Sequence, residues 1–96
     1  MERLSLVAIV TAKLGHKDFV RAEIEKLIPI TRLEAGCLNY NLYEDNQNPN
    51  RFVLLENWES HALWQGHMNS EHMKRYSDVT RDAVENWELI ELTEID

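Results

Sequence analysis

Three side chains in the middle of the sequence carry chemistry that a reactive site needs. Glu56 and Trp58 stand two residues apart, and His67 follows further along the chain. Imidazole has an unperturbed pKa of about 6.5, so His67 is a candidate to take up or release a proton at neutral pH. Trp58 offers an aromatic wall and one N–H donor. The alternatives are that His67 only closes a junction between two helices and that Trp58 is a core residue.

Glu56 is the most informative of the three because it lies within an apolar strand pattern. A carboxylate between Leu54 and Trp58 is costly to bury without a partner. We therefore expect Glu56 to face a cavity or to pair with a basic side chain, either a histidine or an arginine in a structural ion pair. Of these possible partners for Glu56, we predict a histidine. Glu56, Trp58 and His67 are the candidate catalytic residues.

Other side chains are candidates to border a substrate. His72 and Tyr76 are four residues apart and therefore share one face of a helix, where they could line a pocket mouth. An exposed histidine beside a half-buried tyrosine is the alternative. Asn39 could orient a substrate oxygen from a strand, or belong to a polar edge or a dimer contact. Tyr40 is expected in the core with its hydroxyl turned toward the cavity.

Composition excludes several classes of function. The formal net charge is −7 and the ten basic residues are scattered, which argues against nucleic acid as a partner. The N-terminus does not resemble a signal peptide, and no apolar stretch approaches the roughly 20 residues of a membrane helix. Cys37 is the only cysteine, so no intramolecular disulfide is possible. These features predict a cytoplasmic protein without a membrane partner.

No motif for a metal or a nucleotide cofactor is apparent. His61, His67 and His72 are spaced six and five residues apart, which matches neither a His-Glu-x-x-His pair nor a Cys/His zinc pattern. A glycine-rich phosphate loop is also missing. The sequence therefore predicts no metal and no cofactor.

The hydrophobic periodicity predicts one α+β domain covering residues 1–96, with elements in the order β-α-β-β-α-β. This is the ferredoxin-like arrangement, a four-stranded antiparallel sheet with helices on one face. Pro29 is expected to kink or shorten the first helix. The expected bounds are strand 4–12, helix 16 to Gly36, strand 38–43, turn 44–50, strand 51–58, short helix 60–65, helix 70–86 and strand 87–95.

The sheet face away from the helices is expected to be apolar. Alternation along the strands gives that face Val7, Ile9, Val53 and Leu55. A surface of this kind is seldom left in water. We therefore expect a homodimer that packs sheet on sheet through the open face.

Three segments together resemble a known family. They are Glu34-Ala35-Gly36-Cys37-Leu38-Asn39-Tyr40, Glu56-Asn57-Trp58-Glu59-Ser60 and, after His67, the segment Glu71-His72-Met73-Lys74-Arg75-Tyr76-Ser77. Their order and spacing resemble the antibiotic biosynthesis monooxygenase domain, and within it the quinol monooxygenases. The resemblance covers nearly the whole chain.

This resemblance implies a dimeric α+β barrel that oxygenates an electron-rich aromatic substrate with O₂ and without metal or flavin. Such a substrate loses a phenolic proton, and the resulting anion passes an electron to O₂. The protein would supply an apolar pocket, a proton acceptor and donors to the developing oxyanion. The residues expected to contact the substrate are Asn39, Tyr40, Leu54, His72 and Tyr76.

The chain departs from the family at one of these positions. Some oxygenases of this fold carry a polar amide on the third strand where this chain has Leu54, which cannot donate a hydrogen bond. Three alternatives to the quinol oxygenase remain open. They are a haem-degrading enzyme, an isomerase of the same barrel group, and a non-catalytic stress-response module that binds small aromatic compounds.

Overall fold

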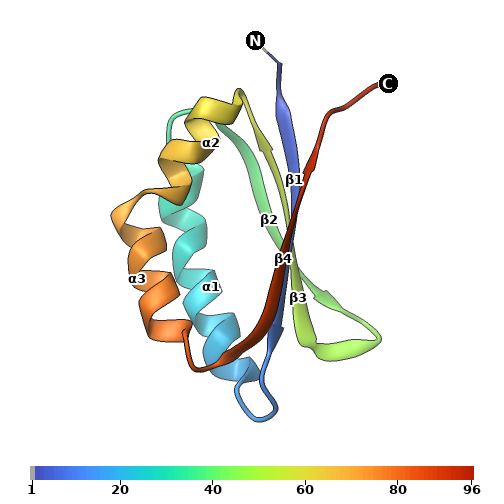
Figure 1. Ribbon diagram of the computed structural model, residues 1–96, viewed down its shortest axis with the longest axis vertical. Helices are drawn as coiled ribbons and strands as arrows, with labels where there is room; N and C mark the ends of the chain where they lie inside the picture. The colour runs from blue at the N-terminus through green and yellow to red at the C-terminus, as the bar shows by residue number, and fades with distance from the viewer. Residues whose placement is uncertain (1) are drawn as a thin grey trace.

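The computed structural model describes residues 2–96 as four strands and three helices (Figure 1). Their order confirms the ferredoxin-like β-α-β-β-α-β arrangement, with a third helix inserted after the hairpin. The elements are β1 (Leu4–Ala12), α1 (Lys17–Arg32), β2 (Cys37–Asp45), β3 (Asn48–Trp58), α2 (His61–Met68), α3 (Glu71–Thr80) and β4 (Val84–Leu92).

The four strands form one antiparallel sheet in the order β2-β3-β1-β4. All three helices lie on one side of this sheet, and the other side is left uncovered (Figure 1). The central pair sets the register, with Leu6 opposite Glu56 and Ala8 opposite Leu54. Because side chains alternate between the two faces of a strand, the side chains of both residues in each pair point toward the helices.

The core lies between the helices and the inner face of the sheet. The apolar stripe of α1 contributes Val20 and Ile24, both fully buried, because they recur at helical spacing. Phe52 and Tyr40 meet this stripe from the sheet, and Trp58 is fully buried near the other end. Alternation predicts the buried face of β3 correctly.

Three predicted boundaries near the end of the chain were wrong. The last helix ends at Thr80 instead of Asn86, and β4 runs from Val84 to Leu92 instead of from Trp87 to Ile95. The backbone N–H of Ala83 bonds to the carbonyl of Thr80, and Val84 already pairs with Ala12 of β1. Ala83 and Val84 fit a helical spacing. Because Val84 pairs with β1, however, Val84 lies in the strand and Ala83 lies in the turn before it.

The hairpin and α1 also differ from expectation. The turn between β2 and β3 contains only Asn46 and Gln47, because Asp45 accepts from the backbone N–H of Gln47 and forms an ion pair with Arg51. The predicted loop over 44–50 is therefore mostly strand. Pro29 lies in the last turn of α1, which ends at Arg32, four residues before the predicted end at Gly36.

The uncovered sheet face carries apolar and amide side chains. Leu55, Ile90 and Leu92 are about two-fifths exposed there, at 39%, 42% and 44%. At one end the Ser5 hydroxyl donates to Asn57, whose amide donates to Asn39 at 2.7 Å. In the described part of the chain, no helix has the length and hydropathy needed to cross a membrane.

Gly36 joins α1 to β2 at a position where only glycine fits. Its φ is +85°, and a Cβ at this residue would lie 2.5 Å from Cδ1 of Leu63 in α2. Gly15 has nearly the same backbone, with φ of +83°, but no atom lies within 4 Å of the place that its Cβ would take. A side chain at Gly15 would therefore add only backbone strain, whereas a side chain at Gly36 would add both backbone strain and a steric clash with α2.

We expect Gly15→Ala to lower the free energy of unfolding by about 1 kcal/mol, the usual cost of a left-handed residue with a Cβ. Gly36→Ala should cost at least about 2 kcal/mol, because α2 must also shift. Urea unfolding followed by tryptophan fluorescence measures both. Equal losses in the two variants would show that α2 does not press on Gly36.

Candidate active site

A cavity of about 490 Å³ opens between the inner face of the sheet and the helices α2 and α3. Its walls are mainly apolar and come from every strand and helix of the fold. A volume of this size is typical of pockets for small organic ligands. The lining residues that matter below are Tyr40, Leu54, Glu56, His67, Met73 and Tyr76.

His67 projects from α2 into this buried region, and only 2% of the residue is exposed. Its ring lies 4.9 Å from the ring of Trp58 and meets Tyr40 edge-on at 5.5 Å, centroid to centroid. Nδ1 lies 2.6 Å from Oε2 of Glu34, so Nε2 is the nitrogen left for the cavity. Burial lowers the pKa of His67, and the Glu34 carboxylate opposes that effect.

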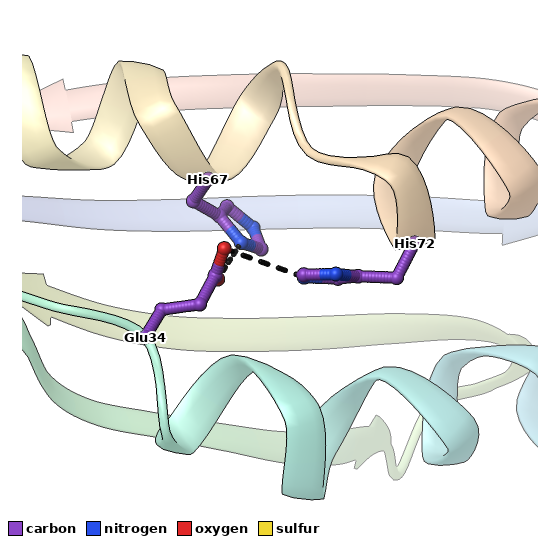
Figure 2. Close-up of side chains that lie close together, drawn as sticks. All are labelled: Glu34, His67 and His72. Atoms are coloured by element: carbon purple, nitrogen blue, oxygen red, sulfur yellow. Dashed lines mark hydrogen bonds and ion pairs between the residues drawn. The ribbon is translucent and has the colours of Figure 1, made fainter.

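Glu34 is the residue that sequence reasoning missed. It lies in the short connection between α1 and β2, and its side chain reaches both histidines (Figure 2). Oε1 lies 3.4 Å from Nε2 of His72, while Oε2 binds His67. The only signal in the sequence was its place two residues before Gly36, in a segment noted for its resemblance alone. Local spacing cannot show a contact across 33 residues.

Glu56 does not pair with a histidine, which corrects the prediction. It accepts a hydrogen bond from the indole N–H of Trp58 at 3.0 Å. The two residues share one face of β3, so their side chains are neighbours along the strand. Burial raises the pKa of Glu56 to about 7, the Trp58 hydrogen bond lowers it, and the charge of Glu34 raises it further.

The structure brings most of the predicted substrate residues together. Tyr40, Leu54 and Tyr76 line the cavity, and burial raises the pKa of both tyrosines, that of Tyr76 to about 12. His72 is not among the residues that line the cavity; it lies beside Glu34, with its ring 5.9 Å from that of His67.

Asn39 also lies away from the cavity, which corrects the prediction. Its side chain points to the uncovered face of the sheet, where it bonds to Asn57 and to the carbonyl of Leu55. Alternation places Asn39, Asn41 and Tyr43 on a common face of β2, but does not show which side of the sheet that face is. The register opposite Asn57 decides it, and within a single chain Asn39 cannot contact a ligand in the cavity.

The comparison with known proteins agrees with this architecture. Residues 3–79 match the model of the antibiotic biosynthesis monooxygenase family. The chain belongs to this family. The resemblance of the segments around Glu34, Glu56 and His72 is thereby confirmed.

Among curated relatives, "Probable quinol monooxygenase YgiN" of Escherichia coli is 29% identical over 91 residues, covering 84% of this chain and 88% of that protein. Among solved structures, PA3566 of Pseudomonas aeruginosa has a TM-score of 0.95 at 31% identity, covering 100% of this chain and 97% of its own. SO0527 of Shewanella oneidensis has a TM-score of 0.93 at 26% identity, covering 97% and 91%. This chain is thus a monooxygenase-type domain by family.

The site of this family member holds two titratable groups in different environments. His67 is shielded by aromatic rings and held by a carboxylate, whereas Glu56 faces apolar walls and one indole donor. Pairs whose environments push their proton affinities apart are typical of acid–base sites. Glu34, His67 and His72 also offer three ligand atoms within 4.8 Å of one another, a group that histidine spacing alone did not reveal.

The raised pKa of Glu56 predicts a pH-dependent stability. The folded state favours the protonated form, so folding takes up a proton between the ordinary pKa of 4.5 and about 7. The contribution to stability is present below pH 4.5 and is lost as the pH rises through 7. Between pH 5 and pH 8 the loss from this group amounts to about 2 kcal/mol.

We expect Glu56→Gln to remove this loss while keeping an oxygen that can accept from Trp58. Urea unfolding at pH 5 and pH 8 should show a smaller difference for the variant than for the wild-type protein. Glu59→Gln, at an exposed position just after the end of β3, is the matched control and should keep the wild-type difference. An unchanged pH dependence in Glu56→Gln would contradict the assignment.

Proposed function

We infer that this domain is a cofactor-independent monooxygenase that oxidises a quinol-like or polycyclic phenolic substrate with O₂. The observation that carries the proposal is the position of His67 at the wall of an apolar cavity, with one ring nitrogen held by Glu34. A flat aromatic substrate suits such a cavity, because its ring can pack on apolar and aromatic walls.

His67 is the proposed proton acceptor. With the Nδ1 proton donated to Glu34, Nε2 carries the lone pair and can accept the phenolic proton of the substrate. Glu34 is then a positioning residue, since it selects the tautomer and stabilises the imidazolium that forms. Only 1% of the His67 side chain is exposed, and this burial strengthens the electrostatic effect.

The reaction balances without a redox cofactor. A hydroquinone with a free ring position reacts with one O₂ to give a hydroxyquinone and one water. The substrate supplies all four electrons, and one oxygen atom enters its ring. Glu56 lies in the same cavity with a pKa of about 7, so its protonated form can donate a proton to an oxygen intermediate or a substrate oxygen.

Leu54 restricts where donors to the substrate can come from. It lines the cavity at the strand position where a polar amide would otherwise stand, and it offers no hydrogen bond. The indole N–H of Trp58 is already bound to Glu56. We therefore assign the polar contacts with the substrate to His67, Glu56 and the hydroxyl of Tyr40. All three residues border the cavity.

The test is oxygen uptake with a chemically reduced naphthoquinone and protein freed of metal by a chelator. We expect uptake above the spontaneous rate, and a loss of at least about 100-fold in His67→Ala, the usual range for a proton-transfer group. His61→Ala is the matched control, because His61 is exposed, pairs with Glu91 and does not line the cavity.

Absence of uptake above the spontaneous rate in the wild-type protein would overturn the proposal. Tight binding of the quinone without uptake would instead indicate a binding module. An equal loss of uptake in His61→Ala would show that the effect of the His67 substitution is not specific to the cavity.

We also propose that two copies pack together through the uncovered sheet face. Val7, Ile9, Val53 and Leu55 project from the central strands onto that face. A second copy would bury these side chains against their own equivalents, as a two-fold interface requires.

Light scattering at micromolar concentration should give twice the chain mass of 11.3 kDa. Val53→Lys should give a monomer, because two lysines would be buried face to face. Val79→Lys, which changes a partly exposed valine of α3 on the helical side, should leave the dimer intact. A monomeric mass for the wild-type chain would refute the dimer.

A further inference from the structure

We propose that Glu34, His67 and His72 form a binding site for a divalent transition metal, with Zn²⁺ as the ion that best fits the donors. One ligand atom from each residue lies within 4.8 Å of the other two. All three side chains point toward a common centre, from the α1–β2 connection, from α2 and from α3 (Figure 2). Two imidazoles and one carboxylate are a donor set that zinc uses in proteins.

The distances need little change to accept an ion. Two ligands of a tetrahedral zinc site lie about 3.4 Å apart, given metal–ligand bonds of about 2.0–2.1 Å. The separation between Glu34 Oε1 and His72 Nε2 is already 3.4 Å. The 2.6 Å contact between Glu34 and His67 must open, since the ion replaces the proton shared there. Glu34 has a flexible side chain, so this movement does not require the backbone to shift.

Charge and access also favour a cation. In the described part of the chain, the ion pairs of Glu34 are with these two histidines, and no lysine or arginine occupies its oxygens. The side chains of Glu34 and His72 are each 19% exposed, whereas that of His67 is 1% exposed. An ion can therefore reach the two outer ligands first and then the buried one.

The surroundings of the three ligands are suited to holding them in place. The rings of Trp58 and Tyr40 pack against His67 and fix its orientation. Ser70 Oγ donates to the carbonyl of His67 at 2.6 Å and so ties the end of α2 to the start of α3. Its 3.2 Å contact with Nε2 of His72 is one that the ion would replace. Neighbours that restrain the ligands commonly strengthen metal binding by about 10–100-fold. Three protein ligands leave a fourth position for water.

Occupancy of this site would regulate the reaction proposed above, and this part of the inference rests on that proposed function. A metal on Nδ1 of His67 uses the lone pair at that atom, so the neutral ring must carry its proton on Nε2. Nε2 then donates a hydrogen bond and can no longer accept the phenolic proton. Zinc is therefore expected to inhibit quinol oxidation, by changing the tautomer of the proton acceptor.

Binding is tested first, without any substrate. Isothermal titration of the chelator-treated full chain with ZnCl₂ should show one site per chain, and Co²⁺ in its place should give the visible absorption bands of a tetrahedral complex. Glu34→Gln and His72→Gln should each weaken binding by at least about tenfold. His61→Gln is the control, because this exposed histidine pairs with Glu91 away from the cluster.

No saturable binding in the wild-type chain, or wild-type affinity in both cluster variants, would overturn the metal site. Circular dichroism of the variants shows whether they fold. A second readout is the rise in melting temperature with zinc, which should be the same in the wild-type protein and His61→Gln and smaller in the two cluster variants. The regulatory part is tested by oxygen uptake in increasing zinc, where half-inhibition should fall at the measured dissociation constant. Binding without inhibition would overturn the regulatory part, and absence of uptake would overturn only the proposed function.

Discussion

The hydrogen bond between Glu34 and His67 is the contact on which the candidate site depends. It joins two segments that are 33 residues apart, the connection after α1 and the helix α2. The carboxylate must reach a nearly inaccessible imidazole, so the backbone at Gly36 has to let α2 approach closely. The placement of Leu63 against Gly36 and the placement of His67 over Trp58 are consequences of the same close approach.

Burial of polar groups explains the chemical character of the cavity. The sheet and helices remove His67 and Glu56 from water, and each is left with only a small number of protein partners. Desolvation disfavours the charged form of both groups. The cavity therefore holds a neutral base, His67, and an acid, Glu56, that keeps its proton up to near neutral pH.

The helices contact one another as well as the sheet. Glu23 of α1, nearly buried, accepts from Arg75 of α3 at 2.9 Å and from Lys26 at 2.8 Å. This ion-pair group fixes α3 alongside α1, and α3 carries Met73 and Tyr76 into the cavity. The depth of the cavity is therefore set by contacts between helices, away from the groups that could react.

The sequence by itself determined the element order and the inner face of the central strands. These features follow from periodicity and composition, which are local properties of the chain. Only the tertiary structure decided which groups are partners. Glu34 reaches His67, Glu56 bonds to Trp58, and Asn39 turns away from the cavity. Each outcome depends on strand register and helix placement, which local spacing does not encode.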